Sequence, residues 1–356
     1  MPQSDPMREG ERLMTICNSC RYCEGFCAVF PAMERRLRFS ESDLNYLANL
    51  CHNCSECFYA CQYAPPHEFA VNVPKVLAEI RVQSYRKYSW PGIIRSAWLV
   101  TALGIVFTAL ALAFTPRTSG GDFYAAISHG AMVGFFGALG VLVLAFWCIA
   151  LVRFWKEDQS RPALTVHAFL DALKAILTLS NLSSHGAGCT YPDERHSQAR
   201  RVFHHFTFYG FLLCFASTSV AAIYDNFFGW RAPYAYLSVP VLLGALGGIG
   251  LIIGPLGLLA LKMHRDPRIV DARQDGMDLS LIGLLLASGV TGLALMLLRG
   301  TAAMSPLLAI HLAVVAALFV TLPFGKFVHG IYRSAALLRN ALEQRHRDQS
   351  QHRGER

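Results

Sequence analysis

The sequence predicts an all-α protein in which a polar, cysteine-rich N-terminal domain precedes a bundle of six transmembrane helices. Three observations predict this fold class. Eight of the 11 cysteines lie within the first 90 residues, which are otherwise polar. Long apolar runs fill residues 97–327, and 53% of the whole chain is hydrophobic. The segments next to the cysteines carry helix start signals and apolar residues at helical spacing.

The predicted domains follow the same division. Residues 1–90 form the cysteine-rich domain and residues 91–335 the transmembrane domain, with an amphipathic segment at 153–202, and residues 336–356 form a basic tail. The first apolar stretch long enough to cross a bilayer begins near Ala97, so no signal peptide is visible. The N-terminal domain is therefore expected in the reducing cytoplasm, where clustered cysteines indicate metal ligands rather than disulfides.

Two copies of a C-x2-C-x2-C-x3-C motif, "CNSCRYCEGFC" and "CHNCSECFYAC", occupy the N-terminal domain. This spacing is typical of a protein with two [4Fe–4S] clusters, in which the fourth cysteine of each run binds the other cluster. The expected ligands of cluster 1 are Cys17, Cys20, Cys23 and Cys61. Those of cluster 2 are Cys51, Cys54, Cys57 and Cys27. Paired zinc sites are the alternative, but zinc usually takes two cysteines from each knuckle, so the third close cysteine favours iron–sulfur clusters.

The segment between the two motifs, "SESDLNYLANL", is expected to be a helix. Ser40 and Asp43 fit an S-x-x-D helix start. Leu44, Leu47 and Leu50 then recur at near-helical spacing. A second helix is expected in "VPKVLAEIRVQSYRKY", where a proline stands in the first turn. Helices next to the cysteines predict an α-helical ferredoxin domain rather than the small bacterial type that contains β-strands.

Six stretches are apolar over the roughly 20 residues that a membrane-spanning helix needs. They cover about 97–114, 131–152, 203–223, 237–261, 279–298 and 305–327. The loops on one side carry most of the Lys and Arg residues, whereas the opposite loops carry only Arg117, Arg231 and Arg299. The positive-inside rule then places both termini in the cytoplasm, which requires an even number of spans. Because topology explains the net charge of +8, nucleic-acid binding is not expected.

The stretch "ALTVHAFLDALKAILTLSNL", residues 163–182, is too polar to be a seventh span because Asp171 and Lys174 interrupt it. A seventh span would also place the two termini on opposite sides of the membrane. We expect an amphipathic helix that lies along the cytoplasmic face of the bilayer. Of the cysteines outside the motifs, Cys148 and Cys214 are expected to be small apolar-facing residues, and Cys189 has no assigned role.

Histidines in membrane spans are costly, so each one is a functional hypothesis. His311 and His329 stand 18 residues apart. On one continuous helix that is five turns, so both rings would face one direction, about 27 Å apart along the axis, unless Pro323 kinks the helix between them. An inner pair (His329 with His204 or His205) and an outer pair (His129 with His311) could each supply the two axial ligands of a b-type haem. The alternative is that these residues hold their polar tips among the lipid headgroups.

Several segments together resemble the tricarballylate/citrate utilisation protein B family. They are the two cysteine motifs, "YAPPHEF", "GCTYPDERHSQARRVFHHFTFYGFLLCF", "RQDGMD" and "PFGKFVHGIYR". The resemblance implies a multi-pass protein of the bacterial inner membrane that holds two iron–sulfur clusters and a haem. Such a protein reoxidises the reduced flavin of a partner FAD-dependent tricarballylate dehydrogenase, or one for a citrate-related acid. It passes the electrons to the quinone pool.

The spacing of His311 and His329 also resembles the last haem-bearing helix of nitrate reductase gamma subunits, which are cytochrome b-like membrane proteins. In that family two histidines of another helix complete two haems. Here the third span offers His204 and His205 near one end, but Cys214 stands where a further histidine would be expected. This resemblance therefore favours one haem, with a second left open.

The expected electron path runs from the partner's FADH2 through the two clusters and the inner haem to quinone. The candidate quinone pocket lies near His329, Lys326, Asp275 and Asp278; in the alternative interpretation this loop only caps the fifth span. The chain has no G-x-G-x-x-G after a strand, so no flavin or nicotinamide domain of its own is expected. One rival function is an iron–sulfur membrane anchor or redox sensor without haem. A six-span transporter is the other, disfavoured because the span centres almost lack charged residues.

Overall fold

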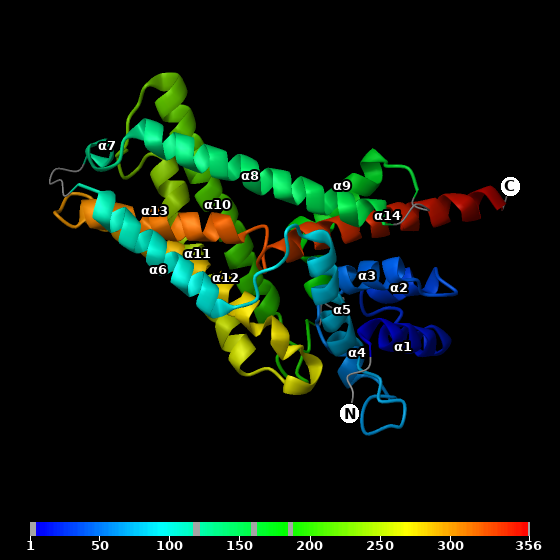
Figure 1. Ribbon diagram of the computed structural model, residues 1–356. Coiled ribbons are helices and arrows are strands. Elements are labelled where there is room, and N and C mark those ends of the chain that lie inside the picture. Colours follow the sequence, from blue (N-terminus) through cyan, green and yellow to red (C-terminus); the bar gives the residue numbers. More distant parts are fainter. Residues whose placement is uncertain (1–4, 117–121, 158–161, 184–187, 355–356) are drawn as a thin grey trace.

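Figure 1 shows the computed structural model, which describes residues 5–116, 122–157, 162–183 and 188–354. The described residues form helices and no β-strand; the one extended pairing among them is an isolated bridge between Cys189 and Ser197. The predicted all-α fold class is therefore confirmed. The helices of the N-terminal domain gather at one end of the molecule, and the long apolar helices extend away from them (Figure 1).

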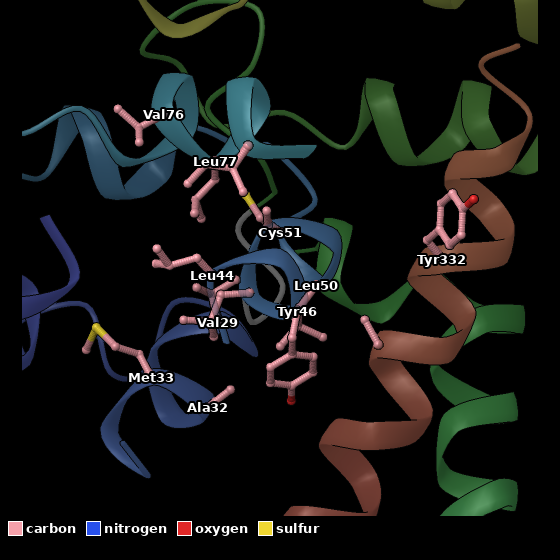
Figure 2. Packing of buried hydrophobic residues seen from close by; sticks show 14 of the residues in the cluster. Val29, Ala32, Met33, Leu44, Tyr46, Leu50, Cys51, Val76, Leu77 and Tyr332 are labelled. Atoms are coloured by element: carbon pink, nitrogen blue, oxygen red, sulfur yellow. The ribbon is translucent and has the colours of Figure 1, made fainter. Parts of the chain in front are cut away.

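Five helices build the N-terminal domain: α1 (Pro6–Cys20), α2 (Val29–Glu34), α3 (Glu41–Leu50), α4 (Glu56–Tyr59) and α5 (Val73–Tyr88). The predicted start of α3 is confirmed, since Ser40 and Asp43 form a reciprocal capping box. The proline of α5 also lies in its first turn, as predicted. Figure 2 shows Leu44 of α3 and Leu77 of α5 within the apolar core, with Tyr332 of a C-terminal helix at its edge.

Six helices are long and apolar enough to cross a membrane, which confirms the predicted number of spans. They are α6 (Ala97–Phe114), α8 (His129–Lys156), α10 (Ala199–Phe228), α11 (Val239–Met263), α12 (Asp275–Leu298) and α13 (Met304–Thr321). Large apolar side chains such as Phe114, which is 82% exposed, cover the outside of the bundle. A soluble protein rarely exposes so much contiguous apolar surface, so the arrangement is that of a multi-pass membrane protein.

The last predicted span does not continue to residue 327. Helix α13 ends at Thr321, and α14 (Val328–Gly354) starts after a turn that contains Pro323 and Gly325. The carbonyl of Thr321 accepts the N–H of Gly325 at 2.7 Å, which closes the turn. Proline cannot donate to a helical ladder and clashes with the preceding turn. The prediction that His311 and His329 share one helix face is therefore wrong, because the two residues lie on different helices.

Helix α14 contains most of the predicted basic tail. It packs along α9 (Val166–Thr178) and also touches α3 of the N-terminal domain (Figure 1). Ala336 and Leu342 are buried on its inner side. One helix thus begins at the membrane bundle and ends beside the N-terminal domain, which ties the two together.

Helix α9 confirms the expected amphipathic helix at 163–182. Ala168 and Ala172 are buried against Ala341 and Leu342 of α14. On the opposite side Phe169 is 55% exposed, and other large apolar side chains share that face. An apolar face that points away from the protein suits a helix at the bilayer surface. The remaining described elements are short: α7 (Phe123–Ala126), η1 (Ser180–Leu182), η3 (Pro267–Ile269) and η4 (Ala272–Gln274).

Helices α10 and α11 approach each other through glycines. A Cβ atom added at Gly210 of α10 would lie 2.9 Å from the carbonyl carbon of Gly250 of α11, closer than real side chains come to backbone. Small residues at such positions let transmembrane helices pack backbone to backbone. The contact holds α10, which carries His204, in its place in the bundle.

Replacing Gly210 by leucine is expected to push α10 and α11 apart and to cost about 1–3 kcal/mol, the usual effect of overpacking. The thermal unfolding midpoint of the detergent-purified protein, followed by tryptophan fluorescence, measures this cost. Gly140→Leu on α8 is the control, because a Cβ added there meets nothing within 4 Å. Equal midpoints for the two variants would show that the glycine contact does not support the bundle.

A candidate iron–sulfur and haem site

The eight cysteines of the two motifs are free thiols that surround two adjoining cavities. One cavity is lined by Cys27, Cys51, Cys54 and Cys57. A larger one is lined by Cys17, Cys20, Cys23, Cys61 and again Cys57. The structure thus brings together the two expected sets, with the last cysteine of each run placed among the other run's thiols. Because Cys57 borders both cavities, the two sites are direct neighbours.

Backbone geometry turns the thiols of the second motif inward. Cys51 follows the last residue of α3, and Cys57 lies on the short helix α4. Between them Asn53 and Ser55 adopt left-handed conformations with φ of 55° and 72°, which bend the chain sharply around Cys54. The backbone N–H of Asn53 also donates to the Cys51 sulfur at 3.3 Å. Such hydrogen bonds to ligand sulfurs tune a cluster's potential.

The thiols are held in surroundings that disfavour a free thiolate. Burial, helped by neighbouring thiols, raises the pKa of Cys17 and of Cys23 to about 12. Burial also raises the pKa of Cys27 and of Cys57 well above the ordinary thiol value. Thiols in such a setting become thiolates when a metal replaces their protons. These raised pKa values argue against free reactive thiolates at the four positions.

Two of the candidate haem ligands face each other at the end of the bundle that lies nearest the N-terminal domain. The rings of His204 on α10 and His329 on α14 have centres 6.2 Å apart and planes at 76°. Imidazole nitrogens bind a metal at about 2 Å, so two ligands on opposite sides of one metal have ring centres roughly 6 Å apart. The spacing of this pair therefore fits two axial ligands of one haem.

The ring nitrogens of the pair support the same interpretation. Nδ1–H of His329 donates to the carbonyl of Lys326 at 2.6 Å, which leaves Nε2 as the nitrogen that can bind a metal. Nδ1 of His204 is buried without a hydrogen-bond partner, and so is Nε2 of the neighbouring His205, so this feature does not distinguish the two histidines.

His205 points elsewhere. Its ring packs on Tyr209 with centres 5.7 Å apart. Tyr209 and Arg201, which share that face of α10, donate to the carbonyls of Leu177 and Thr178 at the end of α9. Of the two candidates left open by the sequence, the structure therefore brings His204, and not His205, next to His329.

The outer candidates have separate partners. Nε2 of His129 lies 2.7 Å from a carboxylate oxygen of Asp225 on α10, with the Tyr124 ring against it. Nδ1 of His311 lies 2.9 Å from the hydroxyl of Thr291 on α12. Among the ring contacts of the described residues, none joins His129 to His311. The structure does not bring the expected outer pair together.

Comparison with known proteins gives the family of the chain. Residues 92–350 match the family model described as Citrate utilization protein B, and residues 10–87 match its Fer4-like domain. A curated relative, Citrate utilization protein B of Escherichia coli, is 50% identical over 359 residues, which span 96% of this chain and 94% of the relative. The chain belongs to the citrate utilisation protein B family. No solved structure matches it. The Fer4-like domain is consistent with an iron–sulfur role in electron transfer.

The residues expected near quinone form an ion network in this member of the family. Lys262 lies 2.6 Å from Asp278 and 2.8 Å from Asp275. Lys326 lies 2.8 Å from Asp278 and donates to the side chain of Gln274. Both aspartates stand in the first turn of α12, where negative charge favours the helix N-terminus. This supports the interpretation that the loop caps the fifth span, and the network also fixes Lys326, whose carbonyl holds His329.

Sequence reasoning missed Cys189 and three arginines near the second motif. Cys189 is fully buried beside Cys54, and its thiol raises the pKa of Cys54 well above the ordinary value. The arginines are Arg81, Arg200 and Arg333, which bond to the second motif's backbone. Two of them stand four residues from a candidate haem histidine, a spacing that places both on one helix face and could have signalled their role.

Proposed function

We propose that this member of the citrate utilisation protein B family is a membrane electron-transfer protein. It reoxidises the reduced flavin of a partner dehydrogenase for tricarballylate or a citrate-related acid and passes the electrons to quinone. Its cysteines would hold two [4Fe–4S] clusters and its histidines one b-type haem, and these groups would supply one-electron centres. The observation that supports this best is the sequence of sites in space: two adjoining four-thiol cavities, then a facing histidine pair.

The surroundings of the two cavities suggest the order of transfer. The cavity of Cys17, Cys20, Cys23 and Cys61 opens to solvent beside Tyr22, which is 67% exposed. Cys51 and Cys54 of the other cavity are buried, and the carbonyl of Cys51 accepts from Arg333 of α14. A soluble flavoprotein can therefore reach cluster 1, while cluster 2 faces the membrane helices.

The chain's own residues supply ligands, charges and an apolar enclosure. Haem, when bound, supplies a centre that takes and gives one electron at a time. His204 and His329 would hold it, and the Lys326 carbonyl fixes the His329 ring. Phe327, two residues before His329, stacks on Trp147 with ring centres 5.3 Å apart and contacts Phe211, so the chain next to His329 is packed among aromatic side chains of the bundle.

The same proposal includes a location. The N-terminal domain and α14 lie at one end of the bundle, so both termini are on one side (Figure 1). The loops on that side carry the excess of Lys and Arg. By the positive-inside rule this side is the cytoplasm, and the membrane is the bacterial inner membrane. Both lipid and a cytoplasmic flavoprotein are then within reach of the chain.

Optical spectra of membranes that contain the full chain test this function. Wild-type membranes reduced with dithionite are expected to show a b-type band, and His329→Ala or His204→Ala to lose it, because each substitution removes an axial ligand. The control, His205→Ala, should keep the band. A band that persists in both ligand variants, or disappears with His205→Ala, contradicts the ligand assignment. Two intact clusters without any band in the wild type would instead support an iron–sulfur anchor or redox sensor.

A further inference from the structure

Three arginines converge on the loop that carries the ligands of cluster 2. Arg81 of α5 and Arg333 of α14 both donate to the carbonyl of Cys51 at 2.8 Å. Arg200, at the start of α10, donates to the carbonyl of Asn53 at 2.6 Å. Three positive charges from three helices thus meet at one short backbone segment.

None of the three arginines has a carboxylate partner among the described residues. Each donates hydrogen bonds to backbone carbonyls, and Arg200 also lies over the ring of Tyr191 at 4.5 Å. Nε of Arg333 is buried without any partner. Other enclosed arginines of this chain are paired, as Arg36 is with Glu343. Guanidinium groups taken out of water without a counter-ion are costly, so an anion belongs here.

The position of two of the arginines points to that anion. Arg200 precedes His204 by four residues on α10, and Arg333 follows His329 by four residues on α14. Residues four apart lie on the same face of a helix, one turn from each other. Arg200 lies at the start of α10 and Arg333 one turn after His329 on α14, and both reach the loop that follows Cys51. Both arginines therefore lie between the histidine pair and this loop.

We propose that Arg200 and Arg333 bind the two propionate carboxylates of the haem and so direct its propionate edge toward Cys51. This rests on the proposed function, because it requires a haem between His204 and His329. Arginine is the side chain best suited to carboxylates, since its planar fork makes two parallel, charge-assisted hydrogen bonds. Arg81, which already donates to two backbone carbonyls, adds positive charge behind them.

The arrangement also gives the two arginines a positioning role in electron transfer. Arg333 contacts the backbone of a cluster 2 ligand directly, and Arg200 contacts the residue two positions further on. The two arginines would therefore hold a bound haem on the side of the bundle that faces the Cys51 loop. Removing positive charge there should also lower the midpoint potential of the haem, because the reduced form carries one more negative charge.

Haem binding to full-length protein made in haem-limited cells tests the proposal. The probes are protohaem and its dimethyl ester, in which both carboxylates are blocked. Wild-type protein should bind protohaem roughly 10-fold or more tightly than the ester, the usual range for losing charge-assisted hydrogen bonds. The double variant Arg200→Gln/Arg333→Gln should show no preference. Arg201→Gln is the control, because Arg201 on the same helix bonds to α9 instead and should keep the full preference.

The possible results separate the proposal from the function on which it rests. A wild type that binds neither probe means that the proposed haem function fails. Haem binding without a preference for the free acids, or a preference that survives in the double variant, overturns the propionate assignment alone. If the double variant keeps the wild-type preference for protohaem and only the midpoint potential of cluster 2 falls, the arginines serve as a counter-charge for that cluster instead. If the double variant loses its iron, the single variants Arg200→Lys and Arg333→Lys are tested in its place. Each should keep part of the preference for protohaem over the ester.

Discussion

Replacing Cys27 by serine is expected to damage cluster 2 and to leave cluster 1 intact, although Cys27 belongs to the first motif. In the structure Cys27 lines the cavity of Cys51, Cys54 and Cys57. Loss of one thiolate exposes one corner iron of a cube, which then tends to leave as the cluster becomes a three-iron species. Iron content should fall from about eight atoms per chain toward about seven. Cys61→Ser should do the same to cluster 1.

Combined variants show which cluster each cysteine serves. Cys27→Ser added to Cys54→Ser should cause no further loss of cluster signals, because both residues serve one cluster. Cys27→Ser added to Cys20→Ser should damage both clusters. Electron paramagnetic resonance of reduced protein, with iron and sulfide analysis, measures the outcome. Cys148→Ser on the exposed side of α8 is the control and should leave both signals unchanged. If Cys27→Ser adds nothing to Cys20→Ser, the crossed pairing is wrong.

Much of this could be expected from the sequence because the signals are local. Six apolar stretches of bilayer length need no partner to be recognised, and all six are helices. Ser40 and Asp43 form their capping box within three residues of each other. The cysteine spacing likewise describes how a short loop can wrap one cube, and the thiols that it names line the two cavities of the structure.

What the sequence could not provide depends on contacts between distant segments. His204 and His205 are adjacent, and only the packing of α10 between α9 and α14 decides which ring meets His329. The apolar pattern predicted that the last span continues past Pro323. In the structure the chain turns there, and the hydrogen bond from the N–H of Gly325 to the carbonyl of Thr321 closes the turn. The pairing of His129 with Asp225 joins residues almost a hundred positions apart, which no motif announces.

The contact that ties the N-terminal domain to α14 yields the last prediction. Glu343 of α14 accepts hydrogen bonds from Arg36 at 2.6 Å, from Arg339 at 2.8 Å and from Arg35 at 3.1 Å, and its side chain is 13% exposed. The guanidinium groups of Arg36 and Arg339 lie 4.8 and 4.1 Å from the centre of the Tyr46 ring on α3. Glu343 is therefore the carboxylate that all three arginines share where the two parts of the molecule meet, and Asp43 is a second partner of Arg36 and Arg339.

Glu343→Gln is expected to destabilise this contact by about 3 kcal/mol, because breaking an enclosed ion pair leaves the partner charges uncompensated. Arg36 keeps Asp43 as a second partner, so the effect stays at the low end of the usual range. Asp171→Asn is the matched control. Asp171 of α9 forms an ion pair with Arg345, which lies on α14 like Glu343, but this ion pair is exposed and should contribute less than about 1 kcal/mol to stability. Denaturant unfolding of the purified protein, followed by fluorescence, measures both.

The acid side of the stability profile should change in the same variant. Burial alone would raise the pKa of Glu343, but the hydrogen bond and charge of Arg36 outweigh it and hold the pKa below the ordinary value of 4.5. A carboxyl with a lowered pKa in the folded state stabilises fully above its ordinary pKa and loses that contribution as pH falls through the lowered value. The wild-type protein should therefore lose stability below about pH 4.5 more steeply than Glu343→Gln.

Helix α14 also carries His329 and Arg333. A loosened contact at Glu343 should therefore slow electron transfer from cluster 2 while each cofactor stays bound. Unchanged electron transfer in a destabilised Glu343→Gln variant would mean that this contact supports folding alone.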